Sequence, residues 1–172
     1  MIERFKPKDT INSLLEITPA FLEQRGLKAL LLDIDNTLVP HGSLGSPEAD
    51  LERARLWLSP LRQAGVALRI VSNALPARIR FHAAALEIKA VGSGNTAGKP
   101  FAPVFRTAIA ELELPVTQIA MLGDQLFTDI LGANNAGLHS ILVRPMSDHV
   151  NPHTKAARLL ERLILQRFGV KW

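Results

Sequence analysis

The chain contains no cysteine, and it has no tyrosine and few aromatic residues of any kind. The absence of thiols excludes disulfide bonds, thiolate zinc sites and a cysteine nucleophile. Aromatic residues make up 5% of the 172 residues, and there is no long run of lysine or arginine. Because single-stranded RNA is usually bound by stacking its bases on aromatic rings, these absences argue against a nucleic-acid partner.

The chain also lacks a long hydrophobic run. No segment approaches the roughly 18 consecutive apolar residues of a membrane-spanning helix, and the N-terminus has no signal-peptide core. We therefore expect a cytoplasmic protein. The apolar fraction of 47% is enough for the core of a single domain over residues 1–172. A net charge of +4 fits an anionic partner, such as a phosphoester or an acidic membrane surface.

Helical and strand patterns alternate along the chain, which is typical of βαβ units. After a helical lead-in over residues 1–27, they predict a three-layer α/β/α fold with a five-stranded, mainly parallel sheet. The expected strands are residues 29–32, 66–71, 88–91, 119–122 and 140–143. Three expected helices lie within residues 18–26, 46–65 and 76–86. A fourth begins at residue 103, a fifth spans residues 126–136, and a sixth runs from about residue 152 to 168.

Polar residues follow three of these strands. Asp33 and Asp35 come directly after the first, and residues two apart in an extended chain point the same way. Two like charges that close are costly unless a cation or a proton offsets them. The other clusters are Ser72-Asn73 and Gly123-Asp124 with Asp129, and Lys99 starts the helix before the fourth strand. Ligands of open parallel sheets bind at this carboxyl end, where the strand order reverses.

These segments, in this order, resemble the haloacid dehalogenase superfamily of aspartyl-phosphate phosphatases over about residues 28–143. The segments 17–19, 33–39 and 123–129 resemble most closely the YqeG branch of the class IIIA phosphatases. That branch is similar to the phosphatases that act on phosphatidylglycerophosphate in mitochondria and plastids. The spacing of the motifs leaves no room for a cap domain. The resemblance therefore implies an open site. Such a site suits a large substrate, or it is closed off by a neighbouring subunit of a homo-oligomer.

The resemblance also implies a role for each residue. Asp33 would be the nucleophile, and Asp35 would act as acid and then base. Mg²⁺ would be held by the Asp33 side chain, the Asp35 carbonyl oxygen and Asp124. Asp129 would be a further ligand, or it would contact one of the ligands. The phosphate-binding residues would be Ser72, Asn73 and Lys99, with Thr37 orienting the nucleophile loop. Each of these residues taken alone has a plain structural reading as a turn or loop residue.

The terminal helix has an apolar side and a basic side. The apolar residues are Leu159, Leu160, Leu163, Ile164 and Phe168, and the basic ones are Lys155, Arg158 and Arg162. We expect the apolar side to pack on the sheet, with the charges solvated. The alternative is that this helix lies in the interface of an anionic membrane. Arg78 and Arg144 are candidates for recognising a leaving group.

The sequence thus predicts a Mg²⁺-dependent phosphomonoester hydrolase with an aspartyl-phosphate intermediate, and phosphatidylglycerophosphate as its substrate. One alternative is a phosphatase of a soluble phosphomonoester, such as a sugar phosphate or a nucleotide. Another is a non-catalytic phosphate sensor or RNA-binding assembly factor. A dehalogenase is the third, and the acid at Asp35 disfavours it.

Overall fold

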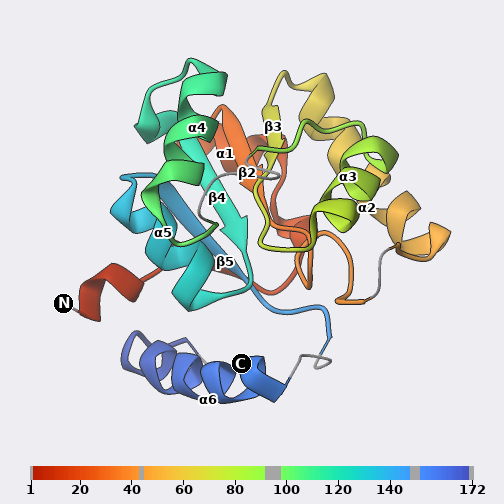
Figure 1. The fold of residues 1–172 in the computed structure, drawn as a ribbon. Coiled ribbons are helices and arrows are strands. Elements are labelled where there is room, and N and C mark those ends of the chain that lie inside the picture. Colours follow the sequence, from red (N-terminus) through yellow and green to blue (C-terminus); the bar gives the residue numbers. More distant parts are fainter. Residues whose placement is uncertain (1, 43–44, 92–97, 148–151, 171–172) are drawn as a thin grey trace.

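The computed structural model describes residues 2–42, 45–91, 98–147 and 152–170, and Figure 1 shows their arrangement. Five parallel strands form one sheet in the order β1-β5-β4-β2-β3. Their bounds are β1 Asp9–Ile11, β2 Ala29–Leu32, β3 Ala67–Ile70, β4 Ile119–Gly123 and β5 His139–Val143. From β2 the chain moves outward to β3 and then returns to the other side of β2 with β4. The strand order therefore reverses between β2 and β4, as in other sheets that bind ligands at this point.

Helices cover both faces of the sheet (Figure 1). The helices are α1 Pro19–Gln24, α2 Glu48–Gln63, α3 Pro76–Ala85, α4 Ala102–Leu112, α5 Leu131–Asn135 and α6 Pro152–Arg167. In β2, Leu30 and Leu32 pack with the core of α2 and α3, while Leu31 packs with the core of α4. Side chains of a strand alternate between faces, so an uninterrupted apolar run can serve two cores at once. The expected α/β/α layers are confirmed, and the described residues form no separate cap domain.

The number of strands agrees with the sequence, but their identity does not. Residues 88–91 form only a single bridge to the sheet, between Ala90 and Ile70. The fifth strand is β1, which lies in the N-terminal lead-in and pairs with β5 at the edge of the sheet. A strand of three residues is too short to show alternation, and long-range pairing with β5 is what makes it extended.

The expected helix over residues 126–136 has two parts. Leu126–Ile130 is a π-helical turn, and α5 continues from it. Such wide turns are rare and occur often at functional sites. Here the turn carries Asp129, whose side chain is fully buried.

The terminal helix α6 lies across the end of the sheet toward which β4 points (Figure 1). It presents Glu161 and Leu165 to the interior, while Leu159, Leu160 and Leu163 are exposed. The expectation that the apolar side packs on the sheet is therefore wrong for these three leucines, although Ile164 of that side does pack beside Leu165. At the end of the sheet, Asp124 pairs with Arg158, and the main-chain N–H groups of Leu126 and Phe127 donate to Glu161. These polar partners favour the opposite orientation of the helix. None of the helices that the structure describes has the length and apolar character to cross a bilayer.

Candidate active site

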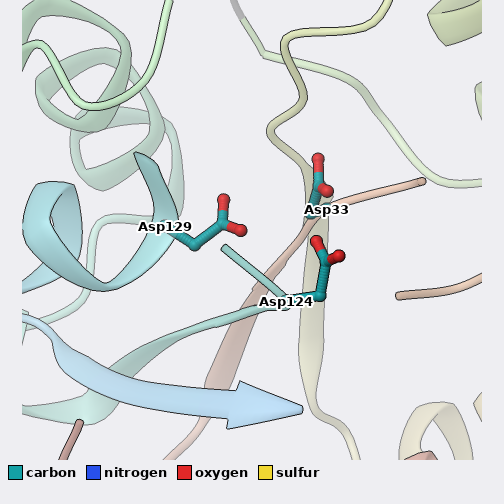
Figure 2. Close-up of side chains that lie close together, drawn as sticks. All are labelled: Asp33, Asp124 and Asp129. Carbon is teal, nitrogen blue, oxygen red and sulfur yellow. The ribbon is translucent and has the colours of Figure 1, made fainter. Parts of the chain in front are cut away.

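Three aspartates meet at the carboxyl end of the sheet, where the strand order reverses. Asp33 follows β2, Asp124 follows β4, and Asp129 comes from the π-helical turn. Figure 2 shows their side chains pointing toward one another. Each offers a carboxylate oxygen, and these oxygens lie within 4.8 Å of one another. The structure thus brings together residues that are up to 96 positions apart in the chain, counting from 33 to 129.

The three carboxylates are removed from water. Asp33 is 4% exposed, Asp124 2% and Asp129 0%. Lys99, itself 5% exposed, places its Nζ atom 2.7 Å from Asp33 Oδ1 and 2.6 Å from Asp129 Oδ1. Lys99 and Arg158, which pairs with Asp124, bring two positive charges against three carboxylates, so the cluster favours a further positive charge.

Burial dominates the pKa values of Asp124 and Asp129. Burial raises the pKa of Asp124 well above its ordinary value, against the opposing effect of Arg158. Burial also raises the pKa of Asp129 to about 6, although Lys99 lowers it. For Lys99, burial acts to lower the pKa, but Asp129 and Asp33 outweigh it and the net pKa is raised. The lysine is therefore charged, and Asp124 and Asp129 hold protons more tightly than isolated carboxyls do.

The cluster fits a divalent cation such as Mg²⁺. Mg²⁺ prefers oxygen ligands, and it is usually held by one or two carboxylates together with water and substrate phosphate. Asp124 Oδ1 is buried and has no hydrogen-bond partner among the described residues, which is costly unless a cation satisfies it. Asp33, Asp124 and Asp129 are the side chains that would hold the ion.

Asp129 reaches the cluster because residue 123 is glycine. A Cβ atom on Gly123 would overlap the carboxyl group of Asp129. The Asp129 carboxylate is also fixed by the main-chain N–H of Gln125, which donates to Oδ2 at 3.0 Å. The glycine before Asp124 therefore allows Asp129 to approach the other two acids.

Gly123→Ala is expected to weaken cation binding by about tenfold or more, because the methyl group must displace Asp129 from the cluster. Isothermal titration with Mg²⁺ measures the effect. Gly65→Ala is the control, since Gly65 follows α2 and a Cβ there meets no atom within 4 Å. Its positive φ of 75° makes that substitution strained, so the control also shows how far general destabilisation alone reduces binding. Equal cation affinity of the Gly123 variant and the unmodified protein would contradict this account of Asp129.

Asp35 lies beside the cluster but takes different partners. Arg78 of α3 donates from Nε at 2.9 Å and from Nη2 at 2.7 Å to Asp35 Oδ1. His41 Nδ1 lies 3.5 Å from the same oxygen. Arg78 also donates to the carbonyl oxygens of Gly45 and Pro40, so it ties Asp35 to the loop that follows it. Asp35 is thus held by its side chain away from the three clustered acids, and its carbonyl oxygen remains only a predicted ligand.

The predicted phosphate-binding residues have structural partners of their own. Asn73 clamps the main chain of Lys99, since its Nδ2 donates to the Lys99 carbonyl and its Oδ1 accepts from the Lys99 N–H, both at 2.8 Å. A Cβ atom on Gly98 would overlap this amide. Ser72 Oγ accepts from the N–H of Ala74 at 3.3 Å. Thr37 is fully buried, and its hydroxyl has no hydrogen-bond partner in the described part of the chain.

Two residues that contact the site are not predicted by the sequence pattern. Arg158 of α6 forms an ion pair with Asp124, and Glu161 accepts hydrogen bonds from the N–H groups of Leu126 and Phe127. In the sequence these residues look like the solvated side of an amphipathic helix. No spacing links them to a loop more than 30 residues earlier, so only the tertiary structure reveals the contact.

Comparisons with known proteins identify the family of the chain. A family model described as HAD-hydrolase-like matches residues 96–158. The chain is 32% identical to the probable phosphatase YqeG of Bacillus subtilis over 161 residues, which are 94% of this chain and 90% of that protein.

Solved structures share the fold. An uncharacterised protein from Listeria monocytogenes superposes with a TM-score of 0.52 at 22% identity, covering 81% of this chain and 99% of that one. A haloacid dehalogenase-like hydrolase from Brucella suis superposes with a TM-score of 0.51 at 14% identity, covering 78% and 93%. With the clustered acids, the fold and the similarity along nearly the whole chain, the protein belongs to the YqeG branch of the haloacid dehalogenase superfamily of phosphatases.

Proposed function

We propose that the protein is a Mg²⁺-dependent phosphomonoester phosphatase that forms an aspartyl-phosphate on Asp33. The observation that carries this proposal is the convergence of three buried carboxylates and Lys99 at the switch point of the sheet. A carboxylate can attack phosphorus and divide the hydrolysis into two easier steps. Mg²⁺ bound at the acids would offset the negative charge of the phosphate as the Asp33 carboxylate approaches.

The surrounding residues support the remaining parts of the reaction. Lys99 lies against Asp33 and would neutralise charge on the transferring phosphoryl oxygens. Asp35 would protonate the leaving oxygen and later take a proton from the attacking water. Arg78 holds the Asp35 carboxylate, which limits the orientations available to it. Ser72 and Asn73 follow β3 and are the proposed hydrogen-bond partners of the phosphate. Asn73 also fixes the main chain of Lys99.

For the substrate we propose phosphatidylglycerophosphate, a lipid phosphate at an anionic membrane surface. The resemblance to the YqeG branch suggests this compound, and the exposed side of α6 is compatible with it. Leu159, Leu160 and Leu163 are exposed there, next to the exposed Arg162. Apolar and basic side chains on one surface helix suit the interface of an anionic bilayer, with the protein bound from the cytoplasmic side.

The substrate proposal predicts a preference that can be measured. In Mg²⁺, phosphate release from vesicles that contain phosphatidylglycerophosphate should exceed release from sugar phosphates and nucleotides by about tenfold or more in kcat/KM. The Asp33→Asn variant provides the blank. Turnover of a soluble compound with the vesicle substrate untouched would refute the lipid assignment and leave the phosphatase chemistry standing.

Membrane contact is tested in the same assay. The Leu160→Ser, Leu163→Ser double variant removes apolar surface from the exposed side of α6 and leaves Arg158 and Glu161 in place. Its activity should fall on vesicles and stay unchanged on a soluble aryl phosphate. An equal fall on both substrates would contradict a role of these leucines at the membrane.

A further inference from the structure

The inward side of α6 carries charged residues that face the acidic cluster. Arg158, Glu161 and Leu165 are spaced by three and four positions and therefore share one side of the helix. Leu165 packs with Leu126 of the π-helical turn and Leu142 of β5, which anchors the helix. The two charged residues then lie over the end of β4 and the start of that turn.

Arg158 holds Asp124 at two points. Its guanidinium donates to Asp124 Oδ2 and also to the main-chain carbonyl oxygen of Asp124. Asp124 Oδ1 is left buried without a hydrogen-bond partner among the described residues, and the side chain points toward Asp33 and Asp129 (Figure 2). One oxygen is thus fixed from outside, and the other is available to a cation in the cluster.

Glu161 fixes the segment that carries Asp129. Glu161 Oε1 accepts from the N–H of Leu126 at 2.7 Å and from that of Phe127 at 3.2 Å, at the start of the π-helical turn. Its Oε2 lies 3.1 Å from Arg158 Nη1, so the two residues support each other. Through this pair, α6 contacts two of the three segments that supply carboxylates to the cluster.

We propose that Arg158 and Glu161 are positioning residues of the divalent-cation site, so that docking of α6 and binding of the cation stabilise each other. The inference rests on the proposed metal site and extends it to the C-terminal helix. Residues that orient metal ligands contribute to affinity because the ligands need not be ordered when the ion binds. Linkage is reciprocal, so an ion that binds better with α6 docked must also favour the docked helix.

A competing account has Arg158 as a rival of the cation for Asp124. In that case its removal would increase cation affinity. The division of the two carboxylate oxygens favours positioning, since Arg158 occupies Oδ2 and leaves Oδ1 unsatisfied. The two accounts predict effects of opposite sign.

The test is Mn²⁺ binding to the full chain, measured by electron paramagnetic resonance. Arg158→Gln should weaken Mn²⁺ binding by roughly 10- to 100-fold. Arg158→Lys should restore part of the affinity, because it keeps the charge. Glu161→Gln, which keeps an acceptor for the two N–H groups, should lose less than Arg158→Gln. Arg162→Gln removes the same charge from the exposed side of α6 and should bind Mn²⁺ as the unmodified protein does.

Hydrogen exchange provides a readout that does not depend on activity or on charge. Mg²⁺ should slow amide exchange in α6 of the unmodified protein and have little effect on α6 of Arg158→Gln. Failure of the unmodified protein to bind Mn²⁺ would overturn the proposed metal site itself. If the unmodified protein binds Mn²⁺, two results would overturn only the role of α6. One is that Arg158→Gln binds Mn²⁺ equally well or more tightly, and the other is that Mg²⁺ does not change amide exchange in α6.

Discussion

Asp33→Asn is expected to reduce phosphate release by roughly 10⁴-fold or more, because an amide cannot form the acyl phosphate that divides the reaction into two steps. The measurement is turnover of an aryl phosphate at saturating Mg²⁺. The unmodified protein, quenched during turnover and reduced with borohydride, should carry the modification on the peptide that contains residue 33. The variant should carry none.

The thermal stability of Asp33→Asn shows whether a loss of activity comes from lost chemistry or from lost folding. Asp33 is one of three buried carboxylates, and its neutral replacement relieves repulsion within the cluster. Lys99 keeps Asp129 as a partner at 2.6 Å. We therefore expect the metal-free variant to melt no lower than the unmodified protein, as happens when a strained active site is relaxed. Asp50→Asn, on the surface helix α2, is the matched control and should retain full activity. Activity of Asp33→Asn within about tenfold of the unmodified protein would exclude Asp33 as the nucleophile.

The second large effect concerns the divalent cation and pH. Without metal, burial raises the pKa of Asp129 to about 6, whereas the unfolded chain loses this proton near 3.8. Between these pH values the folded protein holds a proton that the unfolded chain has released. The free energy of unfolding of the metal-free protein should therefore fall as pH rises from 3.8 to about 6, by an amount on the order of a few kcal/mol.

Mg²⁺ should reverse this loss. A cation binds the ionised carboxylates, so its stabilising effect should be small well below pH 6 and should grow as the pH rises through that value. At a concentration of 100 times Kd, binding adds about 2.7 kcal/mol to the free energy of unfolding. Denaturant titrations at several pH values, with Mg²⁺ or with chelator, measure both effects. The chelator should also abolish turnover. A metal-free protein whose stability rises between pH 4 and 6 would contradict the burial of these acids.

Much of the fold could be predicted from the sequence because the signals are local. The apolar runs of β2 and β4 and the glycine after α1, which has a φ of 66°, mark their elements without tertiary information. The strand β1 is different. It is extended because Asp9–Ile11 pairs with β5, a partner 132 positions later when counted from Asp9 to Ile141. Long-range pairing of this kind leaves no periodic pattern in three residues.

The orientation of α6 shows the same limit. Three leucines of the expected apolar side, Leu159, Leu160 and Leu163, are exposed, and Arg158 faces inward. Hydrophobic periodicity predicts which residues share a side, but a buried countercharge can decide which side packs. Here Asp124 at the end of β4 is the countercharge of Arg158, and it comes close to α6 only after folding.

The sequence alone determined the alternation of helices and strands and the acids, lysine and glycines that follow the strands, because propensity and motif spacing are properties of neighbouring residues. Only the tertiary structure decided how these residues combine: Lys99 between two acids, Asn73 on its backbone, Arg78 on Asp35 and Arg158 on Asp124. The reason is physical, since the energy of a buried charge depends on which other charges the fold brings within a few ångströms of it.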